Sequence, residues 1–585
     1  MNRHKINTLW KSIFLIIFIQ IISNPINNKL QLTNFLSNAC ITREKRDLIE
    51  EKNDIYNFKA LIVTNYEIRP TPILEKHLKR WGLPYEILDI AMQEIDIFFN
   101  ETRKKYSHII IIDPLFLSKE QWNTIISLDS RPKIITSGPL QDNIATTLLG
   151  HTPDFSFQNL KLQCYHLKSS NWNYYNIFPD LKDKPLFVSS KRMVYFCLDI
   201  FEWIERGCFL RGSCLLKEQL FNDQAYLTVK SPRSIAFRMP EDLGSAEKYY
   251  HEVGIYFHGA NEEISIKETE EMADFIRKFK LHVTAPIVMN FVEEDGSLIQ
   301  LDHKFPKQTA ILKKLFKEGL LYPTFHGYTH MLLNRFDSSS LEERKKYNIY
   351  TDFFDIEYQQ NIGYKSQYTK FEKGFKQLND IFGSTKQSKT FIAPGYAYDE
   401  NTLKIAKKFG MSPDMRRTQF GDEFIRARCT LNTSYDIKSS SMMQYLSMRY
   451  PIVIVIHSYN INHKEILFWD YALSQIKEYF TDIKFDFMVD QRNYEKFLEQ
   501  VDIQSLHYPK QNKLKLILKS KYPKTMSNVL ISGKIPQTCY IKRVSVNDEE
   551  IESYKENNCI VEFNINVFQN QEYKIIIEYK QLMEY

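Results

Sequence analysis

Two histidines, His326 and His330, are the residues of this chain whose type and spacing most directly suggest chemistry. Side chains at this spacing lie on one face of a helical turn. Neutral imidazole is the commonest protein ligand for zinc and related metals. The pair therefore predicts a metal site, although two histidines at this spacing also arise by chance on solvated helices.

Acidic and imidazole groups follow two predicted strands elsewhere in the chain. Residues 234–240 alternate as a strand does and lead into Glu241 and Asp242. The apolar run 452–456 predicts a strand buried on both faces, and it ends on His457. Carboxylates and imidazoles supply both metal ligands and proton-transfer groups. The structural alternatives are a solvated turn at Glu241 and Asp242 and a hydrogen-bonded core histidine at position 457.

A third segment, Thr390–Tyr396, predicts a strand followed by a turn. Pro394 gives that turn a rigid backbone, and Gly395 allows a substrate to approach the backbone closely. The ring of Tyr396 could stack on a sugar. The same residues also suit an ordinary turn before the helix that is predicted to begin near Asp399.

In their order and spacing, these segments resemble the NodB-type polysaccharide deacetylase superfamily, with this chain as a divergent member that has a His-Gly-Tyr-Thr-His motif. The resemblance covers residues 234 to about 500. It implies a distorted (β/α)7 or (β/α)8 barrel whose metal and groove residues gather at one mouth. Active sites of α/β barrels lie at the carboxyl ends of the strands, which is where these residues are predicted.

The resemblance also implies a role for each site residue. Asp242, His326 and His330 would hold a divalent metal ion, with zinc expected. Glu241 would be the catalytic base and His457 the catalytic acid. The substrate groove would include three consecutive residues, Pro394, Gly395 and Tyr396.

The chain departs from the family pattern at two positions. Glu241 stands where the family has Asp, so the base carboxylate is one methylene farther from the backbone. Ile392 stands where the best-known members have an Arg that contacts the base. Arg238, on the strand that leads to Glu241, is the candidate to orient the acid instead.

The predicted function is that of an exported, metal-dependent hydrolase of the carbohydrate deacetylase type. It would cleave the carbon–nitrogen amide bond of N-acetyl groups on a cell-envelope or extracellular polysaccharide. One alternative is a glycoside hydrolase on the same barrel, which needs two carboxylates flanking the scissile bond. Another is a non-catalytic envelope protein that binds polysaccharide. Segment 251–259 bears on the second alternative. If residues 253–257 formed the first barrel strand, His258 or Glu252 would lie nearer the mouth of the barrel, and the carboxylate ligand would be missing or replaced.

Composition and length indicate the class of protein and the number of domains. The chain has 585 residues, a net charge of +6 and 43% hydrophobic residues, which describe a folded protein of several domains. No basic cluster with interleaved aromatics stands out, so nucleic acid is not an expected partner. The eight cysteines include no Cys-x-x-Cys pair, so no structural zinc site is expected.

Five regions are predicted along the chain. Residues 1–25 combine a basic start with an apolar run, which predicts a signal peptide or a membrane anchor and a secreted or cell-envelope location. Residues 55–190 contain a β-α-β-α-β series typical of a flavodoxin-like α/β domain. A connecting region, 191–230, precedes the barrel at 231–503. Strands of period two then predict a C-terminal accessory β-sandwich at 510–585.

Overall fold

The structure is a computed structural model of the whole chain. The residues that it describes are 56–93, 95, 98, 106–127, 132–137, 156–157, 162–163, 173–175, 187–189, 193–196, 199–205, 209–221, 224–244, 265–293, 297–330, 351–355, 360–383, 390–413, 425–428, 445–458, 461–557 and 559–582. The predicted signal or anchor segment 1–25 and the competing segment 251–259 lie outside these ranges. Within the described ranges, no helix combines the length and apolar character needed to cross a bilayer.

The chain divides into two compact units, one formed by residues 1–54 and 138–198 and the other by residues 55–137 and 199–585. In the first unit, β8 (Asn173–Tyr175), β9 (Phe187–Ser189) and β10 (Met193–Phe196) pair antiparallel. A short antiparallel pair, β6 (Ser156–Phe157) and β7 (Leu162–Gln163), belongs to the same unit. The remaining elements described below belong to the second unit.

A parallel sheet opens the second unit, with strand order β3-β2-β4-β5. Its strands are β2 (Ala60–Thr64), β3 (Tyr85–Asp89), β4 (His108–Ile111) and β5 (Lys133–Ser137). Helix α3 (Pro72–Trp81) connects the first two strands, and helix α5 (Lys119–Ser127) precedes the last. These elements agree with the β-α-β-α-β series predicted for this region.

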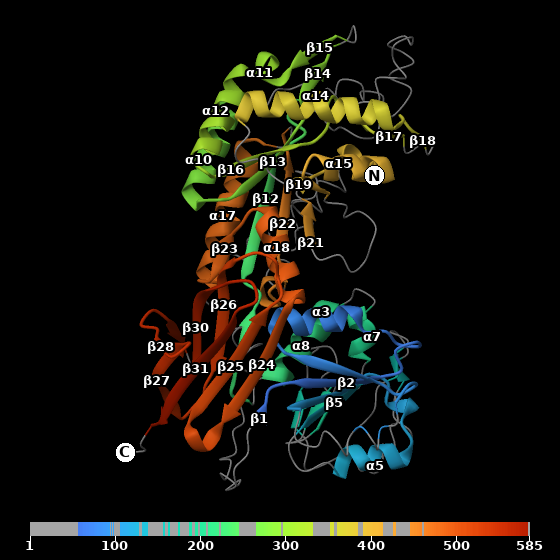
Figure 1. Cartoon of the computed structure of the whole chain (residues 1–585), viewed down its shortest axis with the longest axis vertical. Helices are drawn as coiled ribbons and strands as arrows, with labels where there is room; N and C mark the ends of the chain where they lie inside the picture. Colours follow the sequence, from blue (N-terminus) through green and yellow to red (C-terminus); the bar gives the residue numbers. More distant parts are fainter. Residues whose placement is uncertain are drawn as a thin grey trace, which may run out of the picture. The chain divides into compact units, whose positions relative to one another are not determined.

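The sheet that positions the candidate site is parallel and curled, with order β16-β13-β12-β22-β21 (Figure 1). Its strands are β12 (Arg233–Glu241), β13 (Val283–Ile287), β16 (Leu321–Phe325), β21 (Ile425–Arg428) and β22 (Ile452–His457), with β23 (Ile483–Phe485) also paired to β12. A further parallel pair, β19 (Thr390–Phe391) and β20 (Ser412–Pro413), lies beside β16, where the Thr324 hydroxyl donates to the Thr390 carbonyl. The sheet is therefore a partial barrel in the residues that the structure describes.

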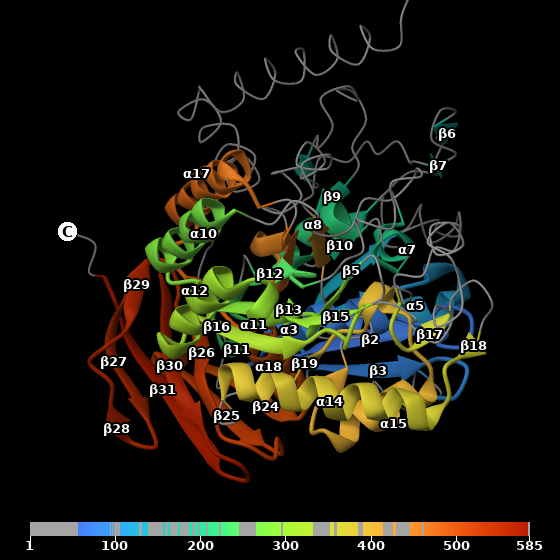
Figure 2. The same ribbon diagram turned by 90° about the horizontal axis from the view of Figure 1, so that it is seen from above.

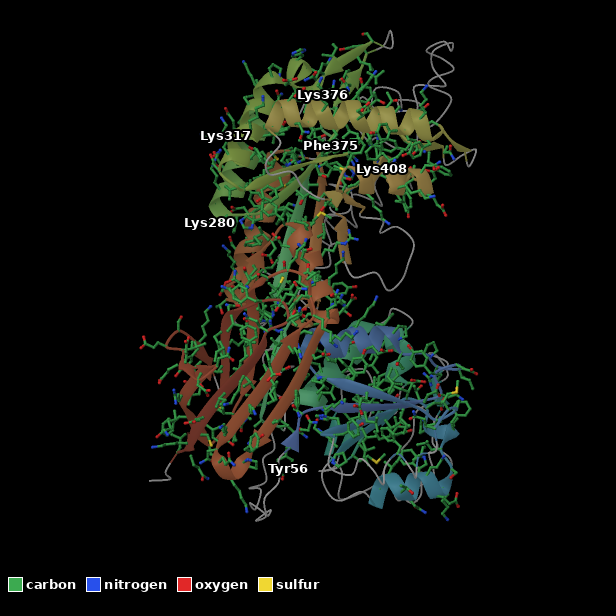
Figure 3. All side chains as sticks on the ribbon, in the orientation of Figure 1. Tyr56, Lys280, Lys317, Phe375, Lys376 and Lys408 are labelled. Atoms are coloured by element: carbon green, nitrogen blue, oxygen red, sulfur yellow. The ribbon has the colours of Figure 1, made fainter. Side chains whose placement is uncertain are left out.

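Helices cover the outside of this curled sheet (Figure 2). They are α10 (Ile266–Phe279), α12 (Pro306–Lys317), α14 (Tyr364–Phe382), α15 (Glu400–Lys408), α17 (His463–Tyr479) and α18 (Met488–Glu499). Helix α10 begins at Ser265, whose side chain forms a capping box with Glu268. All of these helices except α18 turn an apolar face toward the core of the curled sheet, whereas α18 packs Phe497 and Leu498 into the core of the antiparallel sheets. Exposed lysines such as Lys280, Lys317 and Lys376 lie on the outside (Figure 3).

Short elements complete the connections around the sheets. They are helices α7 (Ile200–Glu205), α8 (Phe209–Phe221) and α11 (Leu301–Lys304), the antiparallel pair β14 (Asn290–Val292) and β15 (Leu298–Gln300), and the antiparallel pair β17 (Phe354–Asp355) and β18 (Gln360–Asn361).

Two antiparallel sheets enclose a second core in the C-terminal region. One has the order β1-β24-β25-β31-β27-β28, formed by Tyr56–Asn57, Val501–Tyr508, Lys513–Ser520, Glu572–Gln581, Cys539–Val546 and Glu549–Glu550. The other has the order β11-β26-β30-β29, formed by Tyr226–Lys230, Met526–Lys534, Ile560–Val567 and Lys555–Asn557. Strands β1, β11 and β24 thus come from outside residues 510–585, and long-range pairing of this kind leaves no local pattern in a sequence.

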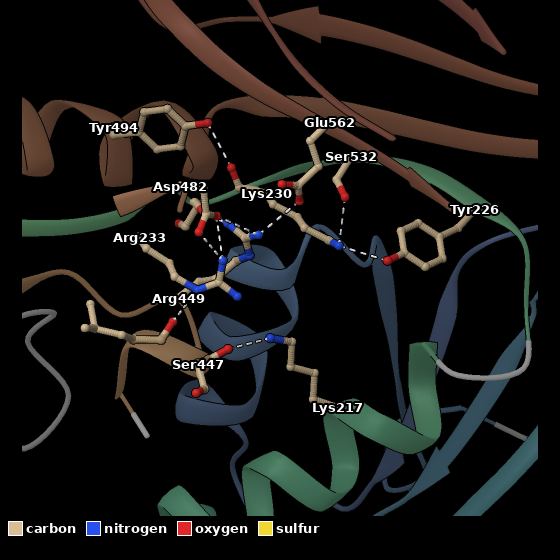
Figure 4. A network of polar contacts seen from close by, with 12 residues as sticks. Lys217, Tyr226, Lys230, Arg233, Ser447, Arg449, Asp482, Tyr494, Ser532 and Glu562 are labelled. Atoms are coloured by element: carbon tan, nitrogen blue, oxygen red, sulfur yellow. Dashed lines mark hydrogen bonds and ion pairs between the residues drawn. The ribbon is translucent and has the colours of Figure 1, made fainter. Parts of the chain in front are cut away.

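A buried polar network joins the curled sheet to these antiparallel sheets (Figure 4). Arg449 Nη2 lies 3.3 Å from Asp482 Oδ2 and 3.1 Å from Glu562 Oε1 on β30. Its Nη1 donates to the Ser231 carbonyl at 3.0 Å, in the link between β11 and β12. Nearby, Lys230 Nζ donates to Ser532 Oγ on β26 at 3.0 Å. Polar side chains thereby fix where β12 enters the barrel region.

Candidate metal centre

The acidic residues of the candidate site lie where β12 ends. Glu241 is the last residue of the strand, and Asp242 follows it with a left-handed backbone (φ 62°). This conformation is uncommon for a residue with a side chain, and such backbones cluster at functional sites. Since β12 pairs in parallel with β13 and β22, the two acids lie at the carboxyl end of a strand inside the curled sheet.

Asp242 lies against both histidines of the motif. Its Oδ1 is 2.8 Å from His326 Nε2 and 3.5 Å from His330 Nε2. One ligand atom from each of the three residues falls within 4.8 Å of the others, and all three side chains are buried. The structure therefore brings together the three residues that were predicted as metal ligands.

The two histidines belong to a loop, which corrects the expectation of a helical turn. His326 directly follows β16, and the chain continues through Gly327 (φ 113°) to His330 (φ 56°). Both angles lie outside the helical region. We call residues His326–His330 the histidine loop. The imidazoles meet because the loop turns back at Gly327, with their ring centroids 5.1 Å apart.

The protonation of His326 shows that the site suits a cation. Its Nδ1 lies 2.8 Å from the Ile392 carbonyl, which can only accept, so Nδ1 bears the proton. Burial lowers the pKa of His326, although Asp242 opposes that shift. The neutral ring then directs the Nε2 lone pair at the Asp242 carboxylate. Two electron pairs 2.8 Å apart repel each other, and a metal ion between them removes the conflict.

The carboxylate of Asp242 is also in the state that a metal ligand needs. Burial tends to raise its pKa, but the adjacent His326, His330 and His457 rings, which donate hydrogen bonds or carry charge only when they are protonated, outweigh burial and hold the pKa well below its usual range. An anionic carboxylate and neutral imidazoles are the protonation states of metal-bound side chains. The donor set of one oxygen and two nitrogens fits a catalytic zinc site with an open position.

Glu241 is held by Arg238, as the sequence analysis suggested. Arg238 Nη2 forms an ion pair with Glu241 Oε1, and both side chains are buried on β12. Among the described residues, no group donates a hydrogen bond to Glu241 Oε2. One carboxylate oxygen is therefore fixed by a cation, and the other faces the interior of the site.

His457 completes the site from the neighbouring strand. It is the last residue of β22 and lies directly opposite Glu241 in the parallel register. Its Nε2 is 3.9 Å from Glu241 Oε2 and 3.6 Å from Asp242 Oδ2. These separations exceed hydrogen-bond distance, so the imidazole lies beside the candidate metal ligands without being bonded to either carboxylate.

The predicted groove segment lies against the histidine loop. Pro394–Tyr396 is a short 3-10 turn after β19, and Asp399 caps helix α15 as predicted. Gly327 lies so close to this turn that an added Cβ would be 2.7 Å from Pro394 Cγ. Gly395 has a left-handed backbone (φ 57°), as its predicted turn requires. The Tyr396 side chain lies outside the described part of the structure.

Sequence reasoning missed one residue of the site, Asp352. Its carboxylate is fully buried and contacts the histidine loop through the backbone nitrogens of Tyr328 and Thr329. Lys370 of α14 lies 2.6 Å away. Asp352 is followed by Phe353 and Phe354 in a segment that contains no metal-ligand spacing, so the sequence offered no signal for it.

Comparison with known proteins finds similarity at the level of structure alone. No family model and no curated protein matches the chain. A putative polysaccharide deacetylase from Mycobacterium smegmatis matches with 11% identity and a TM-score of 0.29, over 46% of this chain and 95% of that one. The Xyl-CE4 domain of a xylanase from the hindgut metagenome of Trinervitermes trinervoides matches with 9% identity and a TM-score of 0.27, over 45% and 91%.

A third match is BA3943 from Bacillus anthracis, a CE4 family pseudoenzyme, with 9% identity and a TM-score of 0.25. The match covers 43% of this chain and 63% of BA3943, which is less than two thirds of that protein. These values describe a distant likeness of fold, so the functional argument rests on the geometry of the site. The chain thus resembles solved structures described as a polysaccharide deacetylase or as CE4 proteins over 43–46% of its length.

Proposed function

We propose that this protein is a metal-dependent hydrolase that removes N-acetyl groups from a polysaccharide. The observation that supports the proposal best is the buried meeting of Asp242 Oδ1 with the Nε2 atoms of His326 and His330. These three residues would hold a divalent cation, and zinc suits their donor atoms. Such an ion lowers the pKa of its bound water to ~7 and polarises a carbonyl group.

The residues around that position would divide the proton transfers of amide hydrolysis. Glu241 Oε2 would accept a proton from the attacking water while Arg238 holds Oε1 in place. His457 would protonate the departing amine, which leaves poorly without a proton. The water oxygen then bonds to the carbonyl carbon, the carbon–nitrogen bond breaks, and acetate and a free amino sugar are released. Pro394, Gly395 and Tyr396 would line the path of the sugar.

The fold suits such a site. We propose that β12, β13, β16, β19, β20, β21 and β22 form one distorted barrel, with the candidate site at the carboxyl ends of its strands. The parallel sheet β3-β2-β4-β5 has the 2-1-3-4 strand order of flavodoxin-like proteins and would serve as a scaffold. The antiparallel sheets would form an accessory β-sandwich. Residues 1–25 would export the protein or anchor it to a membrane. A comparison of the mass of the mature protein with that of the full sequence would test whether this segment is removed.

Metal analysis combined with acetate release from N-acetylated glycans tests the function. We expect about one zinc per wild-type chain, loss of the metal in Asp242→Asn and His330→Ala, and acetate release only by metal-loaded protein. His303→Ala, a matched change of an exposed histidine on α11, should leave both readouts unchanged. Release of sugar instead of acetate would favour a glycoside hydrolase. Polysaccharide binding without turnover or metal would favour a binding protein.

A further inference from the structure

We propose that Asp352 is a positioning residue for the candidate metal centre, and that Lys370 supports it by neutralising its charge. Asp352 would act by fixing the backbone of the histidine loop, and it would touch neither metal nor substrate. This inference rests on the proposed function in one respect, since it takes the histidine loop as a metal-binding loop.

The amide groups of the histidine loop converge on Asp352. The backbone nitrogens of Tyr328 and Thr329 both donate to its Oδ2, the second at 3.1 Å. The Thr329 hydroxyl donates to Oδ1 at 3.2 Å. Successive N–H groups that point at one oxygen form an anion-binding nest. Because Asp352 is fully buried, water cannot take over these hydrogen bonds if the carboxylate is removed.

The carbonyl groups of the loop are held from the opposite side by residues that follow β13. Met289 N donates to the Gly327 carbonyl at 3.3 Å, and Asn290 N donates to the Tyr328 carbonyl at 2.9 Å. Asn290 Nδ2 adds a second bond to the Tyr328 carbonyl at 3.2 Å. Asp352 therefore supplies the acceptor half of a two-sided clamp whose donor half comes from the segment that follows β13.

Lys370 makes the buried charge of Asp352 tolerable. Its Nζ lies 2.6 Å from Asp352 Oδ1 and donates to the Asp352 carbonyl at 3.0 Å. A buried carboxylate is costly unless a cation and hydrogen bonds compensate it. Gly327 completes the fit, because an added Cβ would be 2.6 Å from Asp352 Oδ2. The carboxylate is thus packed directly against the loop.

The clamp bears on metal binding because His330 has a left-handed backbone (φ 56°), which surrounding contacts must maintain. If Asp352 no longer holds the two amides, the loop can relax and separate the His330 and His326 nitrogens. Outer partners of metal ligands typically change metal affinity by about 10–100-fold when mutated. We expect an effect of that size for Asp352.

The experiment measures zinc affinity by competition with a chromogenic chelator, without an activity assay. We expect Asp352→Asn to weaken zinc binding about 10–100-fold and Thr329→Val, which removes one donor to the carboxylate, to weaken it a few-fold. The control is Glu495→Gln, which breaks the buried ion pair between α3 and α18 (Arg80 Nη2 to Glu495 Oε2, 2.8 Å) away from the histidine loop. It should lower the melting temperature and leave zinc affinity unchanged.

The possible results separate the positioning role of Asp352 from the proposed function. Equal zinc affinity in wild type and Asp352→Asn, or an equal loss in Glu495→Gln, would overturn the positioning role. If Asp352→Asn does not fold, Thr329→Val alone tests the positioning role. This substitution removes only one hydroxyl group and leaves the ion pair between Asp352 and Lys370 in place. Wild-type protein that binds zinc no better than His326→Ala would instead overturn the proposed function.

Discussion

Glu241 and His457 lie directly opposite each other on the parallel strands β12 and β22, with 3.9 Å between Glu241 Oε2 and His457 Nε2. The pairing of two strands thus places a carboxylate and an imidazole at one level of the sheet. At this distance the two groups do not form a hydrogen bond with each other. The proposed function assigns Glu241 to accept a proton and His457 to donate one.

The first prediction concerns His457→Ala. Loss of a general acid typically lowers turnover by about 100- to 10,000-fold, and we expect acetate release to fall within that range. Metal content should remain at the wild-type level, because His457 is not one of the three candidate ligands. Metal analysis and acetate release on the same preparation check both statements. Loss of metal from this variant would show that His457 is a ligand, which contradicts its proposed role.

The second prediction concerns the buried ion pair between Arg238 and Glu241. Breaking a buried pair by removing one partner leaves an uncompensated charge and costs about 3–5 kcal/mol. We expect Arg238→Met to lower stability by that order and turnover by about 100-fold, because Glu241 loses its fixed orientation. Denaturant unfolding and acetate release measure the two effects.

Arg238→Lys serves as the matched comparison, since it keeps the charge and loses the planar guanidinium. We expect it to recover most of the stability and only part of the turnover. If Arg238→Met retains full turnover, Arg238 has no orienting role, and its charge only stabilises the fold.

Residues at strand ends could be predicted from the sequence because each follows a recognisable apolar run. Asp242, His326 and His457 follow or end β12, β16 and β22, and parallel strands place such residues at one edge. The backbone conformation between His326 and His330 could not be predicted in this way. A spacing of four residues suits a helix, whereas Gly327 at φ 113° permits a loop that the spacing does not reveal.

The parts that could not be predicted depend on contacts between distant segments. Strand β11 pairs with β26, about 300 residues later in the chain, and such pairing leaves no trace in local periodicity. Asp352 reaches the histidine loop from a segment 22 residues after His330. Lys370 and two backbone amides compensate the buried charge of Asp352, and a single sequence does not show which amides lack another partner.

The third prediction concerns Gly374 in the middle of helix α14. An added Cβ would be 2.4 Å from the Phe325 ring, at the end of the strand that leads into the histidine loop. Alanine normally stabilises a helix relative to glycine by about 1 kcal/mol. Here overpacking should outweigh that gain, and we expect Gly374→Ala to destabilise the protein by about 1–3 kcal/mol.

Thermal unfolding measured beside Lys373→Ala tests this statement, since position 373 is exposed on the same helix. The exposed change should be close to neutral. A melting temperature for Gly374→Ala at or above that of wild type would mean that Phe325 can move aside at little cost.

The fourth prediction concerns Asp490 in the first turn of α18. Burial, with a contribution from Asp486, raises its pKa to about 6. The folded protein therefore holds this proton more tightly than the unfolded chain, in which an ordinary Asp titrates near 3.9. The contribution of Asp490 to the free energy of unfolding is fully present below pH ~4 and is lost as the pH rises to about 6. In that range the unfolded chain has released the proton, so folding must either take it up again or bury a charged carboxylate.

Asp490→Asn removes this titration while keeping the shape of the side chain. We expect the variant to gain stability relative to wild type as the pH rises from 4 to 6 and to keep a constant advantage above that range. Urea unfolding at several pH values, in the presence of a chelator to remove any contribution from metal binding, gives the difference directly. Asp380→Asn, at an exposed position on α14, should show no such pH dependence. A difference that is flat across this range would mean that Asp490 titrates normally in the folded protein.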